Sequence, residues 1–123
     1  MQYSEAFSDL SAIVLEESWV LEVIPATNGL ALRLDAVLTH DHPQYVEPKA
    51  GEVACYRMGW LTVGSGEPVD VRISGAAPAI DATGKPDYGH VDSFVQDSEG
   101  RWELEGDWGY ARVHGPRVTL NLD

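Results

Sequence analysis

The chain has few of the residues on which secreted and membrane proteins depend. Cys55 is the only cysteine among 123 residues, so no internal disulfide can form, and the histidines show no structural-zinc spacing around it. No apolar run approaches the roughly 20 residues that a transmembrane helix needs. The N-terminus has neither a basic start nor an apolar signal-peptide core. These absences predict a soluble cytoplasmic protein in a reducing compartment.

Basic residues are also scarce. Eight Lys and Arg stand against twenty Asp and Glu, which gives a formal net charge of −12. This excess repels the phosphates of nucleic acids and of anionic lipids, so neither nucleic acid nor a membrane surface is expected as a partner. It attracts a basic protein instead. An acidic surface that only keeps the protein soluble is the competing interpretation.

What the chain does contain indicates a single all-β domain over residues 1–123. Apolar residues make up 44% of it, with four Trp and five Tyr, enough for a packed core. In residues 30–39 every second residue is predicted to point to one buried face, the pattern of a half-buried strand. These residues are Leu30, Leu32, Leu34, Ala36 and Leu38. A second run, SWVLEVI, would place Trp19, Leu21 and Val23 together on one face in the same way.

Further alternating or β-rich runs complete the expected strands, and turn residues such as Asn28-Gly29 and Ser65-Gly66 separate them. The runs are VDVRIS, EVACYRMGWLTV, RWELEG, WGYARVH and RVTLNL. Short strands joined by tight turns predict about eight mostly antiparallel strands in a sandwich or a small barrel. We expect at most one helical turn, near SEAFSDLS, with Ser4 as its cap and Phe7 and Leu10 packing inward.

Two longer connections, residues 40–51 and 75–90, are where binding or catalytic residues are most often found. The first begins with His40, Asp41 and His42. With Glu47 these histidines make H-x-H-x4-E, which resembles the first half of the cupin metal motif, without its flanking glycines and without a second histidine motif downstream. A metal site would need a third nitrogen, from His90 or His114. A polar strand end with hydrogen-bonded histidines is the simpler interpretation.

The second connection contains DATGKPDYGHVD. Asp81, Asp87 and Asp92 carry oxygens that suit calcium, but their spacing matches no EF-hand loop. Asp81 also lies one residue too far from Gly84 for the aspartic-protease motif. The favoured interpretation is that the Asp and Thr side chains cap turns while Gly84 and Gly89 adopt positive φ.

The segment RWELEGDWGYARV predicts a hairpin that turns at Gly106 and Asp107. Trp102, Trp108 and Tyr110 are expected to point inward or to be cross-strand neighbours, with the intervening acidic residues on the solvated face. That face is either an acidic stripe for a basic partner or an ordinary hydrophilic sheet surface. Cys55, in the middle of a predicted strand, is expected to be a small buried side chain and not a catalytic thiolate.

Four segments taken together, VLEESWVL, LTHDHPQY…CYRMG, DATGKPDYGHVDSF and LEGDWGYARV, resemble small bacterial all-β proteins of uncharacterised function. Some of these are similar to immunity proteins of polymorphic-toxin systems. The resemblance implies a non-enzymatic protein that binds a partner. It carries no functional residue over to this chain.

The leading hypothesis is therefore a cytoplasmic protein-binding module that meets a basic protein, such as a toxin, and uses no cofactor. Its expected contacts are acidic side chains on two segments: Glu16, Glu17, Glu22, Glu103, Glu105 and Asp107. The alternative hypothesis is a metal- or small-ligand-binding β-barrel enzyme that uses His40, His42 and Glu47. A homo-oligomer joined through exposed Trp or Tyr residues is a third hypothesis.

Overall fold

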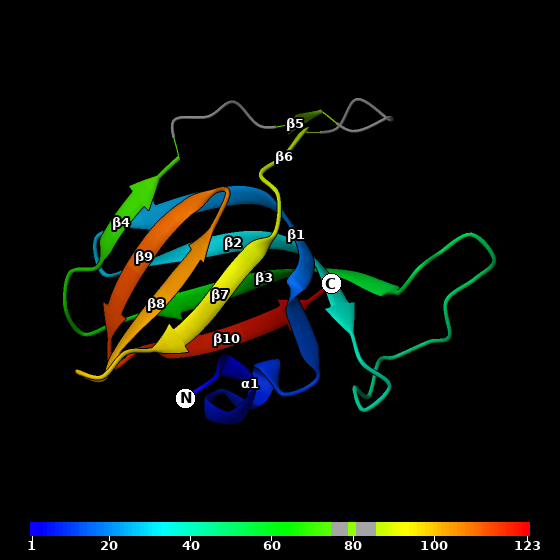
Figure 1. Cartoon of the computed structure of the whole chain (residues 1–123), viewed down its shortest axis with the longest axis horizontal. Coiled ribbons are helices and arrows are strands. Elements are labelled where there is room, and N and C mark those ends of the chain that lie inside the picture. The colour runs from blue at the N-terminus through cyan, green and yellow to red at the C-terminus, as the bar shows by residue number, and fades with distance from the viewer. Residues whose placement is uncertain (75–78, 81–85) are drawn as a thin grey trace.

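The protein is an all-β sandwich in the computed structural model, which describes residues 1–74, 79–80 and 86–123 (Figure 1). Eight strands form two antiparallel sheets of four. Sheet I has the strand order β1–β2–β3–β10, and sheet II has the order β4–β9–β8–β7. The predicted all-β fold of about eight mostly antiparallel strands is confirmed. Because the described strands form two separate open sheets, the sandwich is the correct choice between the two predicted architectures.

Within the described residues, the helical elements are confined to the N-terminus, and a two-stranded ladder, β5–β6, completes the strands. In chain order the elements are α1 (Tyr3–Ala6), the 3₁₀ turn η1 (Ser8–Leu10), β1 (Ile13–Ala26), β2 (Gly29–Leu38), β3 (Cys55–Gly64), β4 (Asp70–Ile73), β5 (Ala79–Ile80), β6 (Pro86–Asp87), β7 (Val91–Gln96), β8 (Arg101–Gly106), β9 (Gly109–His114) and β10 (Arg117–Leu122).

The core lies between the two sheets and follows the predicted alternation. The even-numbered residues of β2 from Leu30 to Leu38 are all buried. Sheet II faces them with apolar side chains from its three longer strands. The principal residues on that side are Val91, Phe94, Trp102, Leu104, Ala111 and Val113. Burial of this continuous apolar surface is the main force that holds the two sheets together.

Strand β1 departs from the predicted alternation. Its pairing with β2 is irregular between Val14 and Trp19 and again between Val20 and Glu22. Each irregularity adds residues to β1 without matching residues on β2, and this shifts which side chains face the core. Val20 is fully buried, whereas Trp19 is only half-buried. The expectation that Trp19, Leu21 and Val23 share one face is therefore wrong.

The N-terminal segment covers one open side of the sandwich. Gln2 pairs with Val95 of β7 in sheet II, and Asp9 accepts a hydrogen bond of 3.0 Å from the Leu120 amide of β10 in sheet I. α1 lies beside β10 at this end of the molecule (Figure 1). The helical turn begins two residues earlier than expected. Its N-cap is Gln2, which makes no side-chain capping bond, so the predicted cap at Ser4 is wrong.

Phe7 and Leu10 pack inward as predicted. Leu10 is fully buried. The Phe7 ring lies 5.5 Å from that of Phe94 and 4.7 Å from that of Trp102, measured between centroids. These aromatic contacts attach the N-terminal segment to the core of sheet II.

Strand β1 also connects the two sheets at the opposite side. Its residue Val20 exchanges backbone hydrogen bonds with the segment that precedes β7: the Val20 amide donates to Gly89 O, and the Tyr88 amide donates to Val20 O, both at 2.8 Å. Trp19 and His90 form an isolated bridge next to them. This contact brings residues 88–90 against the outer end of sheet I.

The two long connections lie where the sequence predicts them. The first extends away from the sandwich between β2 and β3 (Figure 1). Part of the second falls outside the described residues, including Asp81 and Gly84. Within the described part, Gly89 has the predicted positive φ, +76°, and its amide donates to the Asp87 side chain at 2.9 Å. Asp87 therefore caps a turn, as expected.

Candidate partner-binding surface

The irregular part of β1 determines where two of the predicted contact residues lie. The Ser18 hydroxyl is completely buried and donates to Val14 O at 2.7 Å, while the Val37 amide donates to the Ser18 hydroxyl at 2.9 Å. The side chain thus takes the place of backbone pairing that the irregularity removes. The intervening Glu16 and Glu17 are exposed, so the bulge presents two adjacent carboxylates.

Tyr3 holds the same stretch of β1 from the other side. Its hydroxyl donates to the Glu16 carboxylate and accepts a hydrogen bond from the Leu15 amide at 3.1 Å. Burial and the neighbouring Glu16 carboxylate both raise the pKa of Tyr3, because each disfavours a phenolate. Glu16 therefore has a structural partner, whereas Glu17 makes no hydrogen bond or ion pair within the described part of the chain.

A shallow groove of about 290 Å³ lies beside this bulge. The rings of Trp19 and His90 pack against one another in a tilted arrangement, with their centroids 3.9 Å apart and their planes at 46°. Tyr56 of β3 and the segment before it form the opposite side. The complete lining is Glu16, Glu17, Trp19, Val53, Ala54, Tyr56 and His90. The groove thus combines two carboxylates with aromatic walls.

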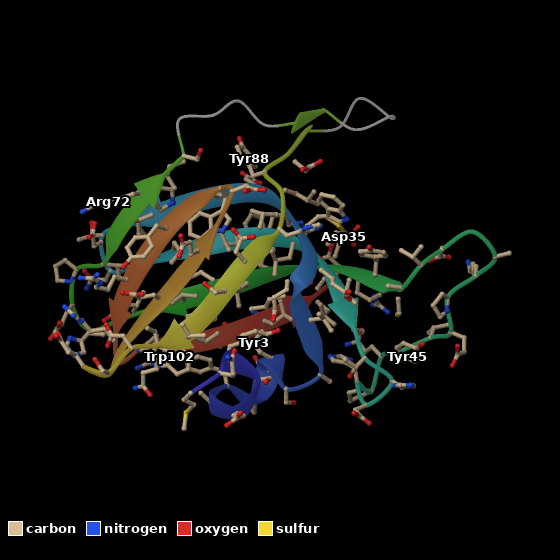
Figure 2. The ribbon with its side chains drawn as sticks, in the orientation of Figure 1. Tyr3, Asp35, Tyr45, Arg72, Tyr88 and Trp102 are labelled. Carbon is tan, nitrogen blue, oxygen red and sulfur yellow. The ribbon has the colours of Figure 1, made fainter. Side chains whose placement is uncertain are left out.

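Asp35 lies on the same outer face of sheet I, on β2. It pairs directly with Trp19 of β1 and with Met58 of β3, and directly paired residues project from the same face. Figure 2 shows Asp35 at the end of sheet I where β1 passes in front of β2. Burial raises the pKa of the Asp35 carboxyl above its ordinary value of 3.8. No hydrogen-bond or ion-pair partner for this carboxylate occurs in the described ranges.

Two other predicted contact residues, Glu22 on β1 and Glu103 on β8, interact with side chains of the protein itself. Glu22 pairs across the strands with Arg33, whose guanidinium also bonds Asp123 at 2.9 Å. Glu103 accepts hydrogen bonds from Tyr110 at 3.1 Å and from Arg112 at 3.2 Å. The charges of Glu22 and Glu103 are thus partly compensated by neighbouring arginines.

Glu105 and Asp107 are exposed at the end of the β8–β9 hairpin. The hairpin turns as predicted, with Gly106 paired to Gly109. The six predicted contacts therefore divide between two sheets: the three on β1 belong to sheet I, and the remainder belong to the β8–β9 hairpin of sheet II.

The aromatic residues of the hairpin lie on both of its faces. Trp102 and Trp108 are buried in the core, as expected. Tyr110 instead lies on the outer face, where it pairs with Glu105 and accepts a hydrogen bond of 3.0 Å from Arg112. Tyr110 is therefore a cross-strand neighbour of Glu105, which is one of the two arrangements that the sequence predicts.

The histidine pair of the first long connection does not gather ligands. The His40 ring lies 5.6 Å from that of Tyr45, and His42 Nδ1 accepts a hydrogen bond of 3.0 Å from the Gln44 amide. His90, a suggested third ligand, packs against Trp19 instead. Throughout residues 1–74, 79–80 and 86–123, no three His, Cys, Asp or Glu side chains are grouped closely enough to hold a metal ion.

The remaining candidates have ordinary surroundings. His114, the other suggested nitrogen ligand, lies 4.0 Å from Glu67. Cys55 is a buried free thiol at the first position of β3, which agrees with the predicted small buried side chain.

No family model, curated protein or solved structure matches this chain. Within the described residues, none of the helices has the length and apolar character required to cross a membrane.

Sequence reasoning missed Trp19, Asp35, Tyr56 and His90 as members of one surface. These residues come from four separate segments, and the bulges in β1 change the face that Trp19 occupies. One signal was present in the sequence: Asp35 is the only acidic residue in residues 30–38, where all others except Arg33 are apolar. An acidic side chain with apolar neighbours is uncommon on the outer face of a central strand, and it indicates a candidate binding residue.

Proposed function

We propose that the chain is a binding module for a basic protein, recruited through its acidic surface. The observation that carries the proposal is the formal net charge of −12. Charge of this size accelerates the encounter with an oppositely charged protein and disfavours acidic partners and nucleic acids.

The positions of the predicted contacts support this proposal. Glu16, Glu17 and Glu105 are exposed, and none of them forms an ion pair with a Lys or Arg of the described residues. Glu16, which is bonded to the Tyr3 hydroxyl, and Glu17 and Glu105 therefore remain unpaired with internal cations of the described residues and are available to a partner's cations. Among partner classes, a basic toxin neutralised in the cytoplasm is the one that the sequence resemblance suggests.

The experiment begins with the intact protein as bait, at low and at high salt, to identify a partner that is then purified. We expect the association rate constant with that partner to fall by at least about tenfold as ionic strength rises from about 0.01 to about 0.15 M, because the Debye length shrinks from about 30 to about 8 Å. Stopped-flow mixing measures this rate.

Two triple variants test which surface is used, and each serves as the control for the other because both remove three negative charges. One is E16Q/E17Q/E22Q, and the other is E103Q/E105Q/D107N. We expect one variant to slow association more than the other, which locates the contact surface. A partner that is neutral or acidic, or association that is insensitive to salt and to both variants, would refute the proposal.

A further inference from the structure

The groove beside the β1 bulge has a distinctive chemical composition. Two carboxylates, Glu16 and Glu17, lie at one side of it, and no Lys or Arg of the described residues lines it. Asp35 does not line the groove, but it pairs with Trp19 on the same sheet face and so places a third carboxylate next to it. The groove is thus anionic, and its lining contains no Lys or Arg of the described residues that could neutralise it.

The walls of the groove can contact both the charged group and the methylene chain of a long cationic side chain. Trp19 and Tyr56 offer aromatic surfaces, which attract guanidinium and ammonium groups. At the rim, Val53 is 89% exposed, and a methylene chain can pack against it. An anionic groove with aromatic and aliphatic walls complements arginine and lysine better than any neutral or acidic side chain.

We infer that this groove binds an arginine side chain of the basic partner, with Glu17 and Asp35 supplying the charge and Trp19 and Tyr56 the aromatic contact. The inference rests on the proposed function and narrows it to one surface and one type of side chain. Arginine is favoured over lysine because its planar guanidinium can stack on an aromatic ring and bond a carboxylate at the same time.

The test uses a small defined probe on the intact protein, so that no partner is required. N-acetyl-arginine amide is titrated while amide and indole N–H signals are followed by NMR, and N-acetyl-citrulline amide, which has nearly the same shape without the charge, is the control. We expect arginine to shift the signals of Trp19, Tyr56 and His90, with a dissociation constant in the millimolar range that one side chain supports. Citrulline should leave these signals unchanged.

Two variants then separate the groove from the general acidity of the protein. Glu17→Gln and Asp35→Asn should each weaken arginine binding by about three- to tenfold, the loss typical of one charged contact at a partly exposed site. Glu105→Gln removes the same charge from sheet II and should leave the affinity unchanged. The undisturbed spectrum outside the groove shows in each case that the variant is folded.

The inference is overturned if arginine causes no shifts, if citrulline causes the same shifts, or if the shifts spread over the acidic surface and are equally sensitive to all three substitutions. These outcomes are distinguishable from failure of the proposed function. If the probe fails while a basic partner still binds in a salt-dependent way, only the groove is wrong. If the probe binds but no basic partner associates, the proposed function is wrong.

Discussion

Ser18 is the residue on which the candidate surface depends most directly. Its buried hydroxyl bonds Val14 O and the Val37 amide and so holds the bulge that presents Glu16 and Glu17. A single polar side chain in a buried strand can thus determine the position of two exposed charges.

Replacement of Ser18 by Ala should destabilise the protein by about 1–3 kcal/mol, because the Val37 amide would remain buried without a partner. Urea unfolding followed by fluorescence measures this change. Ser11→Ala is the matched control, since the Ser11 hydroxyl bonds Ser8 O at an exposed position and its loss should cost less than about 0.5 kcal/mol. Equal effects of the two substitutions would show that Ser18 does not hold the bulge.

Asp35 should make stability depend on pH in a direction opposite to that of a paired carboxylate. Burial raises its pKa in the folded state above 3.8, so the folded protein holds this proton more tightly than the unfolded chain does. The free energy of unfolding therefore falls as pH rises through 3.8 and up to the folded-state pKa.

Asp35→Asn removes this titration. We expect the variant to be more stable than the original protein at pH 7, and the gain to vanish below about pH 3. Thermal unfolding of both proteins across this pH range provides the measurement. A variant that is less stable at pH 7 would indicate that Asp35 has a favourable internal partner. A variant that is more stable and binds arginine less tightly would indicate that this carboxylate serves binding at the expense of stability.

Among the elements, the contact between β1 and the segment before β7 determines the shape of the groove. Gly89 makes this contact possible. Its φ of +76° is unfavourable for residues with a side chain, and an added Cβ would lie 2.9 Å from Asp107 Cβ. The backbone of residues 88–90 can therefore approach both β1 and the β8–β9 hairpin only where no side chain intervenes.

Gly89→Ala should destabilise the protein by about 2–4 kcal/mol, since backbone strain and a steric clash are combined. Gly51→Ala is the control: Gly51 also has a positive φ, +91°, but no atom lies within 4 Å of the added Cβ. That substitution should destabilise the protein by only about 1 kcal/mol, because it adds backbone strain but no steric clash. The difference between the two losses in unfolding free energy, measured by urea unfolding, gives the contribution of the close contact between Gly89 and Asp107. Equal costs would contradict the packing of residues 88–90 described above.

For the molecule as a whole, the excess negative charge opposes folding as well as attracting basic partners. The exposed ion pairs, such as Arg33 with Asp123 and Arg112 with Glu103, contribute at most about 1 kcal/mol each. Twelve uncompensated charges outnumber them, and their mutual repulsion is the larger long-range effect.

The melting temperature should therefore rise by about 2–5 °C as ionic strength increases from about 0.01 to about 0.15 M, because salt screens this repulsion. Differential scanning calorimetry in sodium chloride tests this, with choline chloride as the control against specific sodium binding. A melting temperature that falls with added salt would mean that the ion pairs dominate.

Much of the fold is predictable because burial imposes a simple period on strands. The even-numbered residues from Leu30 to Leu38 are apolar in sequence and buried in the fold, and turn residues such as those before Gly109 mark the hairpin correctly. The predictions fail where that period is interrupted. The sequence around Trp19 contains no Gly or Pro to mark a bulge, so its face could not be assigned.

Two properties follow from the amino-acid sequence alone: the all-β class, because strand alternation is local, and the acidic surface, because net charge does not depend on the fold. The candidate surface follows only from folding. Trp19, Tyr56 and His90 are far apart in the chain and meet at one groove, next to Asp35, because β1 bulges and crosses toward residues 88–90. Contacts of this kind depend on the packing of distant segments, and no local pattern encodes them.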